Sequence, residues 1–485
     1  MLLILIVSLY TSRIILQVLG VEDYGIYNLC AGFVTFLTFI SNALVSAMQR
    51  YFNVALGRKD IQYYNAIFSM SINVLIVFST LIIILGETIG LWFVINHLNI
   101  PPDRFNATLW VYQVSLVTFV INVLRTPYHA SIIAHERMSF YAYFSFIEVL
   151  LRLGAVFLLN CLPGDKLILY AILYMVVILF INVAYITYCK SQFVECRYRY
   201  SKNTTLLKEL LGFSSWTLVG QASVVIKNQG EAIFVNRFFS VVANAAMGVA
   251  SQVTSALDMF VMNFQTAFNP QLIQSYASKD HEGHRVLLFR ASKFSYYLLL
   301  IMLVPVVPNI DYILSLWLVE VPDYTSSFII YILISYLFNA LSTPFTTSIF
   351  ATGKIKYYQI SLSCIFVGGL VLAYVLLARG AEPYYVSIVS IFIQFALFIS
   401  RIYYAHKYVN ISFKRYSVDV LLPCIIVTCL AIILPYILNK YTFTDFQIVM
   451  SILIEILYVG LVILLFGTNR LERRSLFNLI KHKIK

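Results

Sequence analysis

The sequence has 485 residues, of which 60% are hydrophobic and only 12% are charged, and its formal net charge is +12. This composition excludes a water-soluble protein, because a soluble surface needs about twice this share of charged side chains. It also argues against nucleic acid as a partner, since the basic residues lie between apolar runs and fit anionic lipid headgroups. The sequence therefore predicts an all-α integral membrane protein.

Apolar runs of about 20 residues, long enough to cross a bilayer as helices, recur along the whole chain. The runs are continuously apolar rather than alternating, which excludes the strands of a membrane barrel. The predicted spans are 1–19, 25–47, 66–86, 108–131, 140–159, 167–189, 213–236, 243–266, 294–317, 327–351, 359–378, 385–406, 418–438 and 446–466. We therefore expect fourteen transmembrane helices.

The basic residues predict the orientation of these spans through the positive-inside rule. With the N-terminus in the cytoplasm, cytoplasmic segments receive most of the 34 Lys and Arg residues, including Lys293 and Arg401 near span ends. The opposite face receives only Arg13, Arg104, Lys166, Arg237, Arg379 and Lys440. The C-terminus is then also cytoplasmic, and residues 469–485 are expected to form a peripheral basic amphipathic helix on the inner leaflet.

Two short sequence patterns recur six spans apart. The segment RTPYHASIIAHERMSFYAYF from Arg125 matches STPFTTSIFATGKIKYYQIS from Ser342, and Lys59-Asp60 recurs as Lys279-Asp280. The repeat predicts two six-helix lobes in the same orientation, two extra C-terminal helices, and a substrate pathway between the lobes. The expected domains are an N-lobe over 1–200, a C-lobe over 201–417, and the last two spans with the tail over 418–485.

Several ionisable residues lie inside spans, where they are costly unless they face a cavity or a partner. Glu148 and Arg152 are spaced i,i+4, as are Lys227 and Glu231, so each pair can meet on one helix face. The candidate substrate-facing cations are Arg13, Arg125, Arg152 and Lys227, and the candidate supporting or ion-coupling groups are Glu148, Glu231 and Asp258. The alternative is that the pairs are internal salt bridges that hold the bundle together.

No motif in the chain predicts an enzyme. There is no phosphate-binding glycine loop, no nucleophile elbow, and no histidine-rich or paired-carboxylate loop. The seven cysteines are scattered and have neither metal-site nor disulfide spacing. We therefore expect a transporter without catalytic residues, metal or cofactor, and the sequence leaves open whether Na⁺ or H⁺ is the coupling ion.

The segment TSRIILQVLGVEDYGIYNLCAGFVTFLTFISNALVSAMQRYF, Thr11–Phe52, resembles the opening of bacterial polysaccharide flippases. These are the O-antigen and capsule repeat-unit translocases of the multidrug/oligosaccharidyl-lipid/polysaccharide exporter superfamily. The most specific part is LGVEDYGIYN, although the chain lacks the short basic segment usually found before the first helix. The resemblance implies a V-shaped bundle, alternating access and a cationic cavity for an undecaprenyl-pyrophosphate-linked glycan. By position, Arg13 and Arg50 resemble the family's functional arginines.

The leading hypothesis is a flippase for lipid-linked oligosaccharide in a bacterial inner membrane, acting by alternating access in the synthesis of a surface polysaccharide such as the O-antigen of lipopolysaccharide. Its expected partners are the polyprenyl-linked glycan, anionic lipids, a polysaccharide polymerase and glycosyltransferases. One alternative is a drug or organic-cation antiporter of the same superfamily, which would favour an acidic cavity, whereas the charges inside the spans nearly balance. Another is a non-transporting scaffold of a glycan-assembly complex, which would not explain the polar span around Lys227.

Overall fold

The computed structural model describes residues 7, 11, 14–15, 17–20, 23, 26–27, 38–97, 102–159, 161–199, 203–239, 241–318, 321–438, 445–469 and 472–473. These residues form helices and their connecting loops, and they contain no strand. The all-α prediction is therefore confirmed for the described part of the chain. Of the predicted tail helix, only Asn469, Glu472 and Arg473 are among the described residues.

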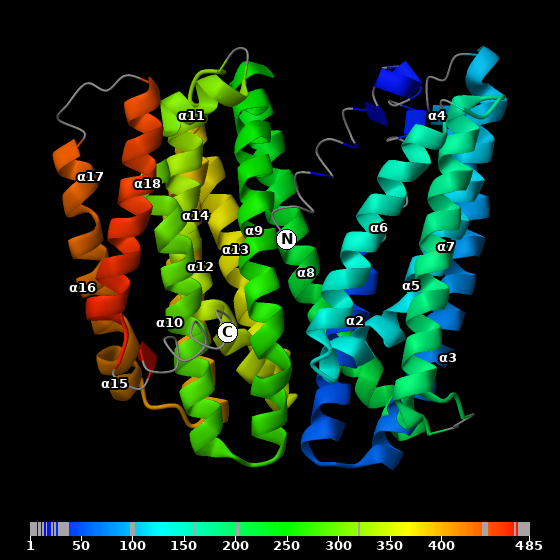
Figure 1. The fold of residues 1–485 in the computed structure, drawn as a ribbon, viewed down its shortest axis with the longest axis horizontal. Coiled ribbons are helices and arrows are strands. Elements are labelled where there is room, and N and C mark those ends of the chain that lie inside the picture. The colour runs from blue at the N-terminus through cyan, green and yellow to red at the C-terminus, as the bar shows by residue number, and fades with distance from the viewer. Residues whose placement is uncertain are drawn as a thin grey trace, which may run out of the picture. The chain divides into compact units, whose positions relative to one another are not determined.

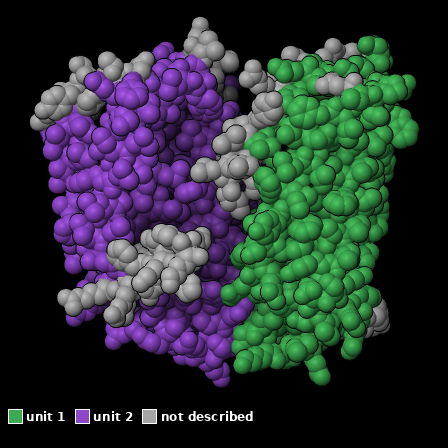
Figure 2. Space-filling view, in the orientation of Figure 1, with its two compact units in different colours: residues 1–218 green, residues 219–485 purple. Residues whose placement is uncertain are grey.

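The chain divides into two compact units, residues 1–218 and 219–485, called unit 1 and unit 2 (Figure 2). Unit 1 contains α2 (Thr38–Gly57), α3 (Ile61–Leu85), α4 (Leu91–His97), α5 (Phe105–Ala134), α6 (Met138–Leu158), α7 (Lys166–Gln192) and the first part of α8 (Thr204–Phe238). Unit 2 contains the rest of α8 and the helices α9 (Val241–Ala277), α10 (His281–Val306), α11 (Ile310–Trp317), α12 (Thr325–Thr352), α13 (Lys356–Ala378), α14 (Tyr385–Val409), α15 (Phe413–Tyr416), α16 (Leu422–Ala431), α17 (Ile433–Leu438) and α18 (Asp445–Val462), which Figure 1 shows in rainbow colours.

Ten described helical segments are long and apolar enough to cross a membrane, and nine of them correspond to predicted spans. The tenth, His281–Val306, begins 13 residues before the predicted span 294–317, whose last part falls in α11. The other predicted spans are α8 and α9, which are helical but more polar, and the first two, much of which lies outside the described residues. Large apolar side chains such as Ile425 and Leu457 point outward, as lipid-facing positions do. The chain is thus a multi-pass membrane protein, and the exact number of fourteen spans and the lobe arrangement stay predictions.

Each unit is organised around one central helix. In unit 1, α5 packs against α2, α3 and α7, and the Asn182 side chain of α7 donates to the Ile121 carbonyl of α5 at 2.9 Å. In unit 2, α12 packs against α9, α10 and α14 around a buried cluster that includes Leu299, Phe328 and Ala340. The polar side chains described below therefore project from helices with firmly packed backbones.

The predicted sequence repeat corresponds to a repeat of local structure in α5 and α12. Pro127 and Pro344 lie inside these helices, where a proline removes one backbone donor. In each copy a serine four residues later donates to the proline carbonyl, Ser131 at 2.8 Å and Ser348 at 3.3 Å. α5 and α12 therefore contain the same arrangement of a proline and a serine four residues later.

The second repeated pattern, Lys59-Asp60 and Lys279-Asp280, also adopts the same conformation in both copies. Both lysines adopt a left-handed backbone, with φ of 56° and 63°, which turns the chain sharply. The following aspartates cap α3 and α10 by accepting hydrogen bonds from backbone N–H groups at 2.9 Å. The turn between α2 and α3 therefore has the same conformation as the turn between α9 and α10.

Candidate functional site

Unit 1 contains a cluster of three charged residues that face one another from α5 and α6. The Arg125 Nη1 of α5 lies 3.2 Å from Glu148 Oε2 of α6. Arg152, one turn further along α6, donates to the other oxygen of the same carboxylate. The predicted i,i+4 contact between Glu148 and Arg152 is confirmed, and Arg125 joins it from a neighbouring helix.

Helix α7 provides aromatic faces for both arginines of this cluster. The Arg125 guanidinium lies 5.5 Å from the ring centre of Tyr185, and the Arg152 guanidinium lies 4.8 Å from that of Tyr174. Cations over aromatic faces are attracted by the ring quadrupole. Because one carboxylate faces two guanidiniums, the three side chains together carry a net positive charge.

The other two predicted arginines are not part of this cluster as the structure describes it. Arg50, in the second half of α2, has its guanidinium 4.6 Å from the ring centre of Tyr51 and 5.1 Å from that of Phe213. Arg13 lies outside the described residues. Their assignment as substrate-binding residues therefore stays a prediction.

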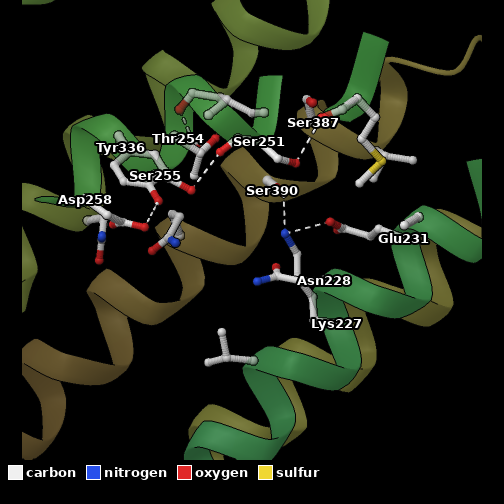
Figure 3. A pocket seen from close by; sticks show the side chains of 18 of the residues that line it. Lys227, Asn228, Glu231, Ser251, Thr254, Ser255, Asp258, Tyr336, Ser387 and Ser390 are labelled. Atoms are coloured by element: carbon white, nitrogen blue, oxygen red, sulfur yellow. Dashed lines mark hydrogen bonds and ion pairs between the residues drawn. The ribbon is translucent and has the colours of Figure 1, made fainter. Parts of the chain in front are cut away.

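Unit 2 contains a cavity of about 670 Å³ between α8, α9, α12 and α14 (Figure 3). Most of the residues that line it are polar, and they bring hydroxyl, amide and charged groups to the wall. Three of the predicted residues, Lys227, Glu231 and Asp258, line this one cavity. Since they come from two different helices, the structure brings together residues that spacing alone could not connect.

Lys227 and Glu231 form the predicted pair on α8. Lys227 Nζ lies 2.8 Å from Glu231 Oε2 and also donates to Ser390 Oγ of α14 at 2.9 Å (Figure 3). Glu231 is only 3% exposed, and its Oε1 has no hydrogen-bond partner among the described residues. The ammonium is thus held between α8 and α14, and one carboxylate oxygen is left without a donor.

Asp258 of α9 has a different partner. Its Oδ2 accepts a hydrogen bond of 2.8 Å from the Tyr336 hydroxyl of α12 (Figure 3). No basic side chain among the described residues forms an ion pair with it. Asp258 therefore contributes negative charge to the cavity, as a supporting or ion-coupling group would.

Arg401 also lines this cavity, and sequence reasoning missed it. The positive-inside rule assigned Arg401 to a cytoplasmic segment, whereas the structure places it within α14 with only 8% of its surface exposed. It donates to Ser342 Oγ at 2.6 Å and to Asn339 Oδ1 at 3.1 Å. Arg401 could have been found from the sequence, because it lies inside the predicted span 385–406 like the other intramembrane charges.

Lys293 differs from its expected position in the same way. It is a buried residue of α10, and its Nζ lies 2.7 Å from Glu472 Oε2 in the segment after α18. The expectation that the tail is peripheral is therefore wrong at its start, where Glu472 is buried and paired with α10.

Among the described residues, no group of three or more His, Cys, Asp or Glu side chains could hold a metal ion.

Comparison with known sequences gives two family matches and one curated relative. Residues 1–274 match the family model described as polysaccharide biosynthesis protein, and residues 211–375 match the MatE model. The "Uncharacterized membrane protein EpsK" of Bacillus subtilis (strain 168) is 22% identical over 285 residues, 57% of this chain. The matched region spans 55%, or about half, of that relative's length.

Solved structures of transporters share the fold. An outward-facing multidrug resistance MATE family transporter of the MOP superfamily aligns with a TM-score of 0.71 and 11% identity, over 84% of this chain and 94% of that one. The MATE transporter ClbM in complex with Rb⁺ aligns with a TM-score of 0.67 and 14% identity, over 85% and 94%. A MOP superfamily transporter from Pyrococcus furiosus, described as having a binding pocket of reverse polarity, aligns with a TM-score of 0.60 and 13% identity, over 86% and 94%.

At these identities the structural matches establish the fold, and the family models establish the relationship. The polysaccharide biosynthesis match covers more than half of the chain, and the MatE match falls in the same superfamily of exporters. The resemblance noted in the first two predicted spans is thereby confirmed. The chain belongs to the polysaccharide biosynthesis protein family, the flippase-type exporters of the multidrug/oligosaccharidyl-lipid/polysaccharide exporter superfamily.

Proposed function

We propose that this protein is a flippase that moves an undecaprenyl-pyrophosphate-linked oligosaccharide across a bacterial inner membrane by alternating access. The observation that carries the proposal is the polysaccharide biosynthesis match over residues 1–274, which includes the charged cluster of Arg125, Glu148 and Arg152. Both termini are cytoplasmic in this proposal, and the exported repeat unit passes to surface polysaccharide synthesis, with O-antigen as one such product. A polymerase and glycosyltransferases are the proposed protein partners.

The charge of the unit 1 cluster supports an anionic substrate. Moving a diphosphate-sugar headgroup through hydrocarbon without help is prohibitive, because its charges would lose their hydration. Guanidiniums replace that hydration with charge-assisted, often bidentate hydrogen bonds to phosphate oxygens. In the proposal, Arg125 and Arg152 bind the pyrophosphate, and Glu148 holds them in place when the site is empty.

The cavity of unit 2 supports the same proposal through its polar lining. Lys227 acts as a further cation, which Glu231 and Ser390 hold in position between substrates. Glu231 and Asp258 are the candidates for binding a coupling Na⁺ or H⁺, because both are carboxylates on the wall of this cavity. The lipid tail of the substrate stays in the bilayer while the headgroup crosses.

One alternative function has specific support. The MatE match over residues 211–375 fits a drug or organic-cation antiporter, as does Asp258, a carboxylate with no basic partner among the described residues. In that case the carboxylates of unit 2 would bind the substrate, and the arginines of unit 1 would serve only as structural ion pairs. The two functions therefore require opposite charges on the transported molecule.

Transport by the purified protein in proteoliposomes distinguishes the two. One set of vesicles contains a fluorescent undecaprenyl-pyrophosphate oligosaccharide, and its flipping is followed with a membrane-impermeant glycosidase. A second set is assayed for ethidium uptake driven by a Na⁺ or a proton gradient. Glycolipid flipping without ethidium transport is expected. Gradient-driven ethidium transport without glycolipid flipping would overturn the proposal in favour of the antiporter.

A further inference from the structure

Arg401 is a buried cation that no acidic side chain among the described residues neutralises. Its Nη1 donates to Ser342 and Asn339, and its Nε donates to the Tyr358 hydroxyl at 3.3 Å. All three partners are neutral. A guanidinium stays protonated at every physiological pH, and an uncompensated charge is strongly unfavourable in a buried position. Arg401 therefore contributes to the wall of the unit 2 cavity a positive charge that has no acidic partner among the described residues.

The two carboxylates of the same cavity have partners other than Arg401. Glu231 pairs with Lys227, and Asp258 accepts its hydrogen bond from Tyr336. Neither forms an ion pair with Arg401 among the described contacts. A negatively charged ligand would therefore compensate Arg401 without displacing an existing ion pair.

The rest of the cavity wall is rich in hydrogen-bond acceptors. Glu231 Oε1 and Gln394 Oε1 are buried and have no donor among the described residues. The hydroxyls of Ser251, Thr254 and Ser255 on α9 donate to backbone carbonyls of their own helix, so their oxygens are left to accept. A buried acceptor without a donor is costly, and a ligand with several O–H groups would satisfy such a wall.

We propose that the cavity of unit 2 binds an acidic sugar, with Arg401 as the anchor for its anionic group. The acceptors of α8, α9 and α14 then receive hydrogen bonds from the sugar hydroxyls. The cavity volume of about 670 Å³ lies within the roughly 300–1,000 Å³ that is usual for small-ligand sites. This inference rests on the proposed function, since it assigns the sugar part of the transported substrate to unit 2. The anion is either a sugar carboxylate or a sugar phosphate.

Binding to the full-length protein in detergent tests the proposal, with calorimetry as the readout. The three probes are a tetrasaccharide of alternating glucuronate and N-acetylglucosamine, a neutral tetrasaccharide of N-acetylglucosamine, and N-acetylglucosamine 1-phosphate. At least one acidic probe is expected to bind the wild type about tenfold more tightly than the neutral tetrasaccharide. The acidic probe whose affinity depends on Arg401 identifies the anion as a carboxylate or a phosphate.

Two variants separate a binding role from a packing role for Arg401. Arg401→Gln is expected to abolish the preference for the acidic probe, and Arg415→Gln, which alters an exposed arginine, is the matched control and should retain it. Asn339→Asp places a carboxylate 3.1 Å from Arg401 Nη1 without changing the shape of the side chain. It is expected to abolish the same preference while the ligand-free protein unfolds at an unchanged or higher temperature.

Two results would overturn the proposal. One is equal affinity of the wild type for acidic and neutral probes. The other is an unchanged acidic preference in Arg401→Gln or Asn339→Asp, which would give Arg401 a packing role. Because binding is measured without transport, these results differ from a failure of the flippase proposal. A protein that binds acidic sugar through Arg401 but flips no glycolipid would contradict only the proposed function.

Discussion

Glu148 and Arg125 join two helices of unit 1 through a contact of 3.2 Å between Oε2 and Nη1. Arg152 binds the other oxygen of the same carboxylate, so Glu148 restrains both arginines at once. If the arginines bind pyrophosphate, Glu148 competes with the substrate for them. If they are structural, Glu148 is the central acceptor of a packed network.

These two roles predict different results for Glu148→Gln. In the flippase, the variant releases two guanidiniums that remain available to phosphate, so flipping should fall by less than about threefold. Arg125→Gln should lower it by about tenfold or more, since a hydrogen bond to a charged group contributes about 1.5–3 kcal/mol. Equal losses of flipping and of membrane abundance for both variants would indicate a structural ion pair instead.

Lys227 and Glu231 allow a parallel test in unit 2. An ammonium acts on an anionic group as a point charge, so Lys227→Arg should keep substantial flipping, while Lys227→Gln should sharply reduce it. Glu231→Gln should be milder, because it frees the cation rather than removing it. Flipping rates are normalised to the amount of protein in the vesicles. Similar damage from Lys227→Gln and Glu231→Gln, with falling protein levels, would contradict a substrate-binding role.

The start of the C-terminal tail should be essential for stability. Lys293 is buried, and Glu472 is its ion-pair partner at 2.7 Å. Breaking a buried pair by removing one partner costs about 3–5 kcal/mol. Truncation after Thr468 should therefore lower the unfolding temperature in detergent, and Glu472→Gln should reproduce most of the loss.

Truncation after Arg474 keeps Glu472 and is the matched control, since it removes only the remaining basic part of the tail. This shorter deletion should leave both the unfolding temperature and the flipping rate close to those of the full chain. Equal stability of the two truncated proteins would show that the Lys293–Glu472 pair does not hold the tail segment.

Asp23, within the LGVEDYGIYN segment, is predicted to anchor the N-terminal region through Arg104. Arg104 Nη2 lies 2.7 Å from Asp23, which is buried, and Nη1 lies 2.7 Å from Asp165 at the start of α7. Arg104→Gln should destabilise the protein more than Asp165→Asn does, because it leaves the more buried carboxylate without this cation. Thermal unfolding of the two variants measures the difference, and the reverse order would contradict this role.

Much of the fold could be predicted because hydrophobic run length and helix periodicity are local properties. The apolar runs matched nine of the ten described segments of membrane-spanning length, and the i,i+4 spacing correctly paired Lys227 with Glu231. The repeat was visible because the turn at Lys59 and the turn at Lys279 need the same residues to reverse the chain and cap the next helix.

The contacts that sequence reasoning missed are those between helices. Nothing in the spacing of Arg125 connects it with Glu148, because the contact depends on how α5 packs against α6. Arg401 was assigned to a cytoplasmic segment because the positive-inside rule counts residues near span ends and does not distinguish a buried side chain from a solvated one. Lys293 was assigned to one because its span was predicted to begin at residue 294, whereas α10 begins at His281.

The central claim is that unit 1 recognises the pyrophosphate of a lipid-linked glycan. The most direct measurement compares glycolipid flipping by three proteins in matched proteoliposomes: the wild type, the double variant Arg125→Gln/Arg152→Gln, and Arg58→Gln, which alters an exposed arginine of the same unit. The wild type and Arg58→Gln are expected to flip the glycolipid, and the double variant is expected to lose about 100-fold in rate, because it lacks two charge-assisted interactions. Undiminished flipping by the double variant at equal protein abundance would contradict the claim.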